Sequence, residues 1–543
     1  MIINAKDYGI TIGNSIGKEL NSLLESLRGK KEDVEIVFES GDYYIDSEDV
    51  PINTTYITNT IGEKEWRRGE VKNHRRVAIN MSELQNVKLN GNGACFHLRG
   101  VMTNVVIEKS SNITISNLQI DTVSPNLHEV KVTRVSSHSF DFHIDEDSTI
   151  EKKGNQYYFV GKDYEYSLYD SRRWSWWTAF VEEDTPNKVV RHAHPLAASI
   201  GLKRLGEREF RAYTILKPSA KVGNRYYLFD VRRKDVGIFI DRSSNITLDS
   251  VEQNFNYSLA IVAQNSENLY FKSLRLAPNK DKDFKMCSIA DFVHLCMCRG
   301  EIVVRDSEFI GAGDDTLNVH GIHFKVTAVK DKSIVVKFMH SQTYGFNPFR
   351  VGDSINYIDI KTLLPHGGAT ITDVKMLSDY EIELMLDNMV GASTNYVIED
   401  VSANPSLLFE NNYTTRIITR GILVTTRKAK IINNVFDSCS MHSILFSDDA
   451  KNWYESGYVD DVLIEGNTFR YTPMYNICIM PENSEHQGSV HGKFVVRNNK
   501  FEAKENGGIY VKSTKYLELD GNSHIAPNIR IDEKNVEKII NND

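Results

Sequence analysis

The stretch VLIEGNTF (residues 462–469) is a short run of β-forming residues that passes through a polar turn to a single phenylalanine. Two other stretches follow the same template, KIINNVF (residues 430–436) and FVVRNNKF (residues 494–501). In all three an asparagine stands two residues before the phenylalanine, and the phenylalanines are 33 and 32 residues apart. A template that recurs every 20 to 50 residues or so is typical of stacked repeats. We therefore predict one solenoid coil per repeat.

Looser copies of the template occur over most of the chain. They are ITISNLQI (residues 113–120), ITLDSVEQ (246–253), LYFKSLRL (269–276), IVVRDSEF (302–309) and LELDGNS (517–523). Each unit has a hydrophobic face that only a neighbouring unit can cover, so the strands are expected to stack in parallel as a β-helix. The turn residues Asn434, Asn467 and Asn499 are expected to bond to one another as a ladder between coils. A β-sandwich gives no reason for the same side chain at the same offset.

One helix and two long interruptions complete the predicted organisation. Leu20, Leu23, Leu24 and Leu27 fall on one face of a short helix that ends at Gly29 and caps the open end of the solenoid. Two interruptions of the repeat indicate small β domains, both of them barrels, inserted through turns. The predicted parts are residues 1–125 (N-terminal coils with the capping helix), 126–235 (first insert), 236–321 (central coils), 322–404 (second insert) and 405–543 (C-terminal coils).

Charge and cysteine content exclude several classes of function. The chain has 64 basic and 73 acidic residues, a net charge of -9 and no long basic block, so a nucleic-acid partner is not expected. The six cysteines form no CxxC pair, which argues against a zinc site or a disulfide framework. No apolar run is long enough to predict a membrane span. The sequence leaves a homo-oligomer open.

Acidic residues concentrate at FIGAGDDTLNVHG (residues 309–321), where two aspartates follow a glycine-rich turn. Asp291 lies 23 residues before Asp314, about one coil, so we expect the two on adjacent rungs about 4.8 Å apart. Neighbouring strand residues point to opposite faces, so Asp315 joins them only where the backbone leaves the strand. The two glycines before the pair permit such a departure.

Three converging carboxyl groups suit the hydrolysis of a glycosidic bond. One must stay protonated to donate to the leaving oxygen, and another must be ionised to activate water. We predict Asp291, Asp314 and Asp315 as catalytic and leave acid and base unassigned, because coupled acids share their protons. Asn318 and His320 project from the same face by alternation and are predicted to bind sugar hydroxyls.

A metal site and an aromatic sugar-binding surface are two further interpretations. The aspartates lack the spacing of a dedicated calcium loop, so we predict no metal and no cofactor. Trp174, Trp176 and Trp177 could stack on sugar rings or form the core of the first insert, and the sequence leaves both readings open.

Three stretches carry a family resemblance: ADFVHLCMCRGEIVVRDSEFIGAGDDTLNVHG (residues 290–321), RGILVTTRKAKIINNVF (420–436) and NWYESGYVDDVLIEGNTF (452–469). They resemble the α-1,3-galactosidases of glycoside hydrolase family 110, bacterial enzymes that act on blood-group-B-type glycans. The likeness covers nearly the whole chain. It implies a right-handed parallel β-helix with two inserted small β-barrel domains, an inverting mechanism without metal, and release of terminal α-1,3-linked galactose from an oligosaccharide or glycoconjugate.

The resemblance also extends to single residues. It implies a catalytic role for the three aspartates and places Asn318 and His320 in the galactose pocket. His294 and Arg299 stand in the first stretch and are predicted as further substrate-binding residues. The third stretch contains a Trp-Tyr-Glu sequence (residues 453–455) to which we assign no role. Neither a branched nor a linear α-1,3-galactoside is favoured.

Two competing functions stay in view. One is an inverting β-helix hydrolase resembling polygalacturonases, which would need a basic subsite and a clear Arg-Ile-Lys element that this sequence lacks. The other is a non-catalytic, tailspike-like glycan-binding β-helix. Localisation is left open: the given chain shows no signal peptide, so it is secreted or periplasmic by resemblance if a signal was removed, and cytoplasmic otherwise.

Overall fold

The computed structural model describes residues 1–60, 73–168, 178–182, 184–185, 188–196, 198–229, 233–502, 507–524 and 530–543. Within these ranges the chain is built from strands, apart from one α-helix and one short 3-10 helix. Neither helix has the length and apolar character that crossing a membrane requires. The tryptophan cluster of residues 174–177 lies outside the described residues.

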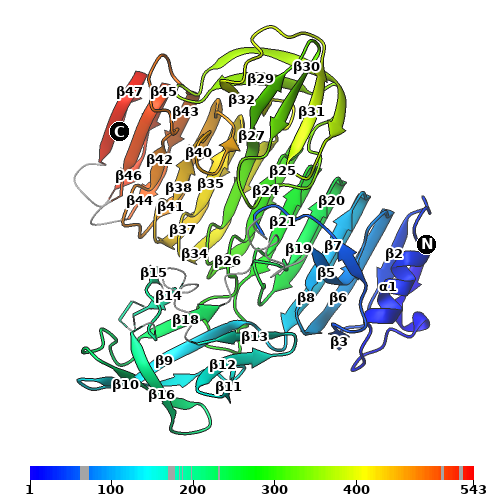
Figure 1. The fold of residues 1–543 in the computed structure, drawn as a ribbon, viewed down its shortest axis with the longest axis vertical. Coiled ribbons are helices and arrows are strands. Elements are labelled where there is room, and N and C mark those ends of the chain that lie inside the picture. The colour runs from blue at the N-terminus through cyan, green and yellow to red at the C-terminus, as the bar shows by residue number, and fades with distance from the viewer. Residues whose placement is uncertain are drawn as a thin grey trace.

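Successive coils of the chain form three parallel sheets that run the length of the molecule (Figure 1). The first contains β2 (Val34–Val37), β6 (Gln85–Arg99), β8 (Ser111–Thr122), β20 (Ser244–Gln253), β22 (Glu267–Lys272), β25 (Arg299–Arg305), β33 (Ser406–Glu410), β36 (Lys428–Ile432), β40 (Asp461–Glu465), β43 (His491–Arg497), β45 (Ile509–Asp520) and β47 (Ile531–Asn541). The second contains β3 (Asp42–Asp46), the later residues of β6, β8 and β20, then β23 (Arg275–Leu276), β26 (Glu308–Ile310), β34 (Tyr413–Ile417), β37 (Val435–Cys439), β41 (Thr468–Phe469), β44 (Lys500–Phe501) and β46 (Ser523–His524).

The third sheet carries the candidate site. It contains β5 (His74–Asn80), β7 (Thr103–Glu108), β19 (Ile238–Asp241), β21 (Ile261–Gln264), β24 (Val293–Cys296), β27 (Leu317–Val329), β35 (Ile422–Thr425), β38 (Ile444–Phe446), β42 (Ile477–Ile479) and the first residues of β45. The inward side chains of all three sheets form one continuous hydrophobic core. Because each coil covers the apolar face of the next, this is the parallel β-helix that the repeats predict.

The predicted asparagine ladder is confirmed. The amide nitrogen of Asn434 donates to the side-chain oxygen of Asn467 (2.9 Å), and that of Asn467 donates to Asn499 (3.0 Å). All three side chains are buried, and their oxygens also accept from the backbone nitrogen of the preceding rung. The phenylalanine two residues later stacks in step, with ring centroids 5.5 Å apart between Phe436 and Phe469. The ladder therefore sets the register of the C-terminal coils.

The N-terminal helix α1 (Gly17–Ser26) covers the open end of the solenoid, as predicted. Leu20, Leu23 and Leu24 are buried on one face of the helix and belong to the main hydrophobic core. Leu27, just beyond the helix, is buried with them.

The first insert is antiparallel and has its own core. Seven strands pair in the order β15 (Val189–His192), β14 (Thr178–Val181), β18 (Arg225–Phe229), β9 (Leu127–Val135), β10 (Ser139–Ile144), β17 (Glu209–Thr214) and β16 (Ser199–Arg204). A separate three-stranded sheet consists of β11 (Thr149–Lys153), β12 (Gln156–Gly161) and β13 (Tyr164–Ser167). We predicted a barrel here; among the described residues the seven-stranded order is open, with no pairing between β15 and β16.

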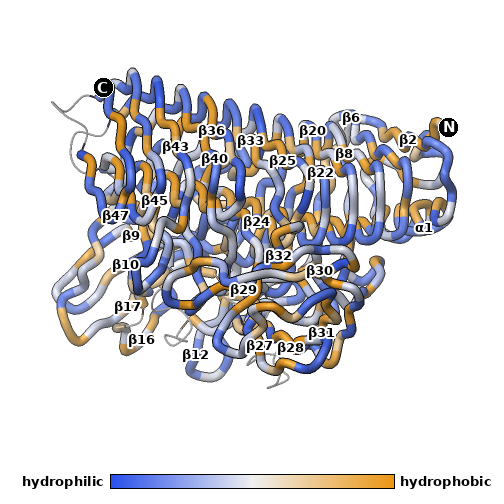
Figure 2. The backbone as a smooth tube through the Cα atoms, turned by 90° about the horizontal axis from the view of Figure 1, so that it is seen from above, coloured by the Kyte–Doolittle hydropathy of each residue, from blue (hydrophilic) through white to orange (hydrophobic). Residues whose placement is uncertain are grey.

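The second insert closes into a small barrel. The pairings run from β27 to β28 (Ser333–Lys337), β31 (Glu381–Leu386), β30 (Pro365–Met376), β29 (Ser354–Asp359) and β32 (Tyr396–Asp400), which pairs with β27 again. Since β27 belongs to both the barrel and the third sheet, the barrel is joined rigidly to the solenoid. Both inserts project from the same side of the coils (Figure 2). The residue boundaries of the five parts stay predictions.

Replacing Asn467 with alanine should destabilise the C-terminal coils by about 2–4 kcal/mol. The change leaves the buried backbone N–H of Asn434 without its acceptor, and an unsatisfied buried group costs about 1–3 kcal/mol. The side-chain amide of Asn434 and the side-chain oxygen of Asn499 each lose one of two hydrogen bonds. Chemical denaturation monitored by circular dichroism measures the loss. Asn433→Gly is the matched control, because Asn433 is exposed and its φ of 55° suits glycine. Equal stability of the two variants would show that the ladder contributes nothing.

Candidate active site

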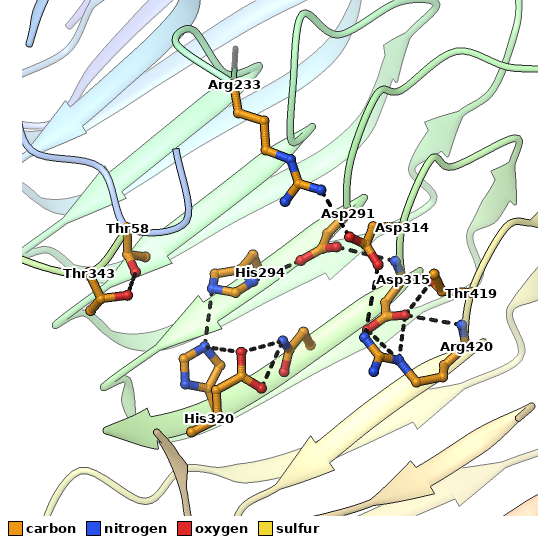
Figure 3. Close-up of polar contacts among 12 residues, drawn as sticks. Thr58, Arg233, Asp291, His294, Asp314, Asp315, His320, Thr343, Thr419 and Arg420 are labelled. Atoms are coloured by element: carbon orange, nitrogen blue, oxygen red, sulfur yellow. Dashed lines mark hydrogen bonds and ion pairs between the residues drawn. The ribbon is translucent and has the colours of Figure 1, made fainter. Parts of the chain in front are cut away.

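The three predicted aspartates meet at the start of two adjacent strands of the third sheet (Figure 3). Asp291 precedes β24, and Asp314 and Asp315 precede β27. The backbone nitrogen of Phe292 donates to the carbonyl of Asp315 (2.9 Å), and the nitrogen of Asp315 donates to the carboxylate of Asp291 (3.2 Å). The neighbour of Asp291 on the next rung is thus Asp315, 24 residues on, and not Asp314 at the predicted 23.

Two glycines let the adjacent aspartates share one side of the coil. Residues 313–316 form a bend before β27 begins, so the alternation of a strand does not apply to them. Gly311 has a φ of 85°, and a Cβ there would lie 2.3 Å from the carbonyl oxygen of Lys285. A Cβ on Gly313 would lie 2.1 Å from the carbonyl oxygen of Ile289. Only glycine allows the turn to pass this close to the neighbouring coil.

The three carboxyl groups lie close together. One oxygen from each of Asp291, Asp314 and Asp315 lies within 4.8 Å of the others. Inverting glycosidases commonly hold their two working carboxyl groups roughly 6.5–9.5 Å apart, which leaves room for water. Oxygens at this spacing could also share a cation, although the arginines described next already supply positive charge.

Asp315 is held as a buried anchor. Its side chain is 1% exposed and accepts hydrogen bonds from the Thr419 hydroxyl (2.6 Å) and from the backbone nitrogen of Arg420 (3.1 Å). The Arg420 guanidinium forks onto both carboxylate oxygens, at 2.9 Å from Nε and 2.7 Å from Nη2. Burial raises the pKa of Asp315 to about 6 against the opposing charge of Arg420, so the carboxylate is ionised at neutral pH.

Asp314 is the most exposed of the three, with 15% of its side chain open to the cavity. Arg233 donates to it at 3.1 Å, and Arg191 and Arg420 lie 3.8 and 3.9 Å away. Burial works against ionisation here, but these three guanidinium groups hold the pKa of Asp314 below its ordinary value. The site therefore contains one carboxylate that stays charged and faces solvent.

Asp291 is the carboxyl group that holds a proton. Its residue is 2% exposed, and burial together with the charge of Asp314 raises its pKa to about 7. Neighbouring carboxyls with pKa values pushed apart in this way are the usual arrangement of an acid and a base.

A pair of histidines supports the same protonation state. His320 Nδ1 lies 2.7 Å from the carbonyl oxygen of Gly321, so this nitrogen carries a proton. Burial lowers the pKa of both rings, that of His294 to about 4, so both are neutral. His320 Nε2 must then accept from His294 Nε2 (3.1 Å), which leaves His294 Nδ1 as an acceptor. Asp291 Oδ2, 2.8 Å from that nitrogen, is the donor and is therefore protonated.

The trio lines a cavity of about 220 Å³ that lies between the coils and the first insert. The first insert contributes Arg191, from β15, and the C-terminal coils contribute Arg420. Asn318 lines this cavity as predicted, and its amide donates to the carboxylate of Glu455 (3.3 Å). His294 and His320 line an adjoining recess.

Trp453 stands between the cavity and the recess. The residue is 48% exposed, and its ring stacks on His340 of the second insert, with centroids 4.4 Å apart and planes 30° from parallel. Trp453 and Glu455 line both the cavity and the recess. The Trp-Tyr-Glu sequence, to which we assigned no role, thus presents an aromatic face and a carboxylate beside the trio.

Arg299 is the one predicted site residue that lines neither the cavity nor the recess. Its guanidinium is buried and bonds to both carboxylate oxygens of Asp353 (2.8 and 2.7 Å) and to Asp400 (3.1 Å). Both partners belong to the second insert. Arg299 therefore holds the barrel against the solenoid, and the prediction that it binds substrate is withdrawn.

The three arginines that surround the aspartates are not predicted from the sequence. Arg420 opens one of the stretches that carry the family resemblance, which is the single signal that could have found it. Arg191 lies in the first insert, and Arg233 lies where the chain passes from that insert back to the solenoid. Neither therefore belongs to the repeat.

Comparison with known proteins bears on the identity of the site. Residues 420–528 match the family described as right handed beta helix region, and residues 333–395 match GLAA-B beta-barrel domain II. The chain is 29% identical over 515 residues to alpha-1,3-galactosidase A of Bacteroides thetaiotaomicron, covering 92% of this chain and 87% of that protein. It is 30% identical over 482 residues to alpha-1,3-galactosidase A of Bacteroides fragilis strain YCH46, covering 86% and 78%.

The chain belongs to the α-1,3-galactosidase family. Among solved structures, it is similar to the tailspike protein of E. coli bacteriophage HK620 in complex with pentasaccharide, with a TM-score of 0.43 and 11% identity. That similarity covers 98% of this chain and 65% of the tailspike chain.

Arg420→Gln should shift the acid limb of the pH profile upwards. Without the guanidinium, burial raises the pKa of Asp315 above the present value of about 6, so the carboxylate is lost at a higher pH. We expect kcat at neutral pH to fall about 10²- to 10³-fold, as when a preorganised charged donor is removed. The pH dependence of kcat measures both effects. Arg470→Gln, at an exposed ion pair, is the control; an unshifted acid limb in Arg420→Gln would contradict the assignment.

Proposed function

We propose that the protein is an exo-acting glycoside hydrolase that releases terminal α-1,3-linked galactose from oligosaccharides or glycoconjugates. The observation that carries the proposal is the convergence of Asp291, Asp314 and Asp315 in one cavity of a chain that belongs to this family. At about 220 Å³ the cavity is smaller than the several hundred Å³ common for ligand sites, which suits a terminal sugar better than the interior of a chain.

In this proposal the acid and the base come from the pair Asp291 and Asp314. The pair shares one transferable proton, which rests on Asp291 in the free enzyme and must reach the leaving oxygen. Asp314 is the open, ionised member and is suited to activate water. Asp315, its oxygens occupied by Thr419 and Arg420, positions the other two and stabilises positive charge on the sugar ring.

Recognition of the sugar is assigned to three other residues that line the cavity. Asn318 and Glu455 offer an amide and a carboxylate that can exchange their mutual hydrogen bond for sugar hydroxyls. Trp453 offers an exposed aromatic face, which suits the apolar face of a sugar ring.

A polygalacturonate substrate is not favoured. The arginines that line the cavity lie against Asp314 and Asp315, where their charge is already opposed. A polyanionic chain would have to compete with those carboxylates for the same cations.

Turnover should be confined to α-1,3-galactosides and should depend on all three aspartates. A panel of p-nitrophenyl α-galactoside, blood group B trisaccharide, linear α-1,3-galactobiose and polygalacturonate tests the substrate. Asp291→Asn and Asp314→Asn keep shape while removing a group that transfers a proton, and each should lower kcat by about 10²- to 10⁴-fold. Asp315→Asn removes the charge that positions them and stabilises the sugar ring, and should lower kcat by about 10²- to 10³-fold. Asp461→Asn, at an exposed position, should leave kcat unchanged. Activity on polygalacturonate alone would overturn the proposal.

The first product should be β-galactose, because the family resemblance implies inversion. The short spacing of the trio makes this test decisive, since retaining enzymes place their carboxyl groups only about 5–5.5 Å apart. Proton NMR of the earliest product from an α-linked substrate identifies the anomer. If α-galactose appears first, the mechanism proceeds by retention through a covalent intermediate, and one of the aspartates is a nucleophile.

A further inference from the structure

A second cluster of ligating side chains lies on the outer surface of the N-terminal coils, apart from the cavity. Asp42 opens β3, and Cys95 and His97 lie on β6. The two strands pair in parallel with Asp42 opposite Cys95. Because Cys95 and His97 alternate with the buried residues Phe96 and Leu98, both point outwards, on the same face as Asp42.

The three side chains already converge. A carboxylate oxygen of Asp42, the sulfur of Cys95 and a ring nitrogen of His97 lie within 4.8 Å of one another. His97 Nε2 is 2.7 Å from the Asp42 carboxylate. Tetrahedral zinc needs its ligand atoms roughly 3.3–3.8 Å apart, so a small closing movement on the half-exposed side of the sheet completes the geometry.

Neighbouring side chains fix the histidine ring. Tyr44, the residue opposite His97 on β3, stacks on it with centroids 5.4 Å apart. The guanidinium of Arg99 lies 3.8 Å from the Tyr44 ring centre and also pairs with Asp46 at 3.6 Å. Orientation of a ligating histidine by its surroundings is a usual feature of metal sites.

The field at the sulfur suits a cation. The carboxylates of Asp121, Asp42 and Glu252 lie near enough to the Cys95 sulfur to interact with it electrostatically. Their negative charge attracts a divalent metal ion. Glu252 is paired with Arg275, whereas the described contact of Asp42 is with His97.

We propose that Asp42, Cys95 and His97 bind a divalent transition metal of the zinc class. The combination of sulfur, imidazole nitrogen and carboxylate oxygen selects zinc over calcium or magnesium, which prefer oxygen ligands alone. Binding releases one proton from the Cys95 sulfur, and it leaves a fourth position open. The bound ion would clip together two strands whose ligands lie 55 residues apart in the chain.

Titration of the chelator-stripped, full-length protein with Co²⁺ tests the proposal. Cobalt occupies zinc sites, and a thiolate ligand produces a charge-transfer absorption band. We expect one equivalent to bind with that band, and Zn²⁺ to displace it. Cys95→Ser should abolish the band, and His97→Ala should weaken binding at least tenfold. His143→Ala, at an exposed histidine of the first insert, is the matched control and should bind as the parent does.

Every other outcome overturns the proposal. Cobalt that binds without a thiolate band would be held by oxygen ligands, such as those of the aspartate trio. A band that persists in Cys95→Ser would come from another cysteine, and the other five are buried. Circular dichroism of each variant shows whether it has folded, so loss of binding in a folded variant is attributable to the missing ligand.

Discussion

Parallel hydrogen bonding between successive coils is the constraint on which this molecule depends. Each rung can satisfy its backbone and cover its apolar face only against the rung before and the rung after it. The register between rungs is therefore shared along the solenoid, and residues one coil apart are forced side by side. Asp291 and Asp315 are neighbours for this reason, as are the asparagines of the ladder.

Burying three carboxyl groups together is unfavourable unless charge or protons compensate. The site uses both means: guanidinium groups lie against Asp314 and Asp315, and a proton resides on Asp291. Among the described residues, the guanidinium groups form ion pairs with Asp314 and Asp315 and not with Asp291. The three aspartates therefore differ in protonation although their side chains are chemically identical. The coils supply the aspartates, while part of the positive charge arrives from the first insert.

Features that depend on neighbours along the repeat could be predicted from the sequence. The template at residues 462–469 predicts the solenoid and its asparagine ladder, and the adjacent aspartates behind two glycines predict a bend with converging acids. Features that depend on contacts between segments remote in sequence could not be predicted. No spacing links Arg233 or Arg191 to Asp314, and none links Arg299 to its partners Asp353 and Asp400 in the second insert. The one-residue error in the offset from Asp291 arose because coil length varies locally.

The closed barrel shares β27 with the third sheet, and the loop that follows its strand β28 places His340 against Trp453. A segment inserted between two rungs changes no pairing on either side of it, so its loops can be lengthened or replaced while the acids keep their positions. The loop that bears His340 can therefore vary the surroundings of Trp453, while the coils keep in place both the acids and the residues proposed to bind the sugar. Sequence changes in this loop can thus be selected without disturbing the groups that cleave the bond.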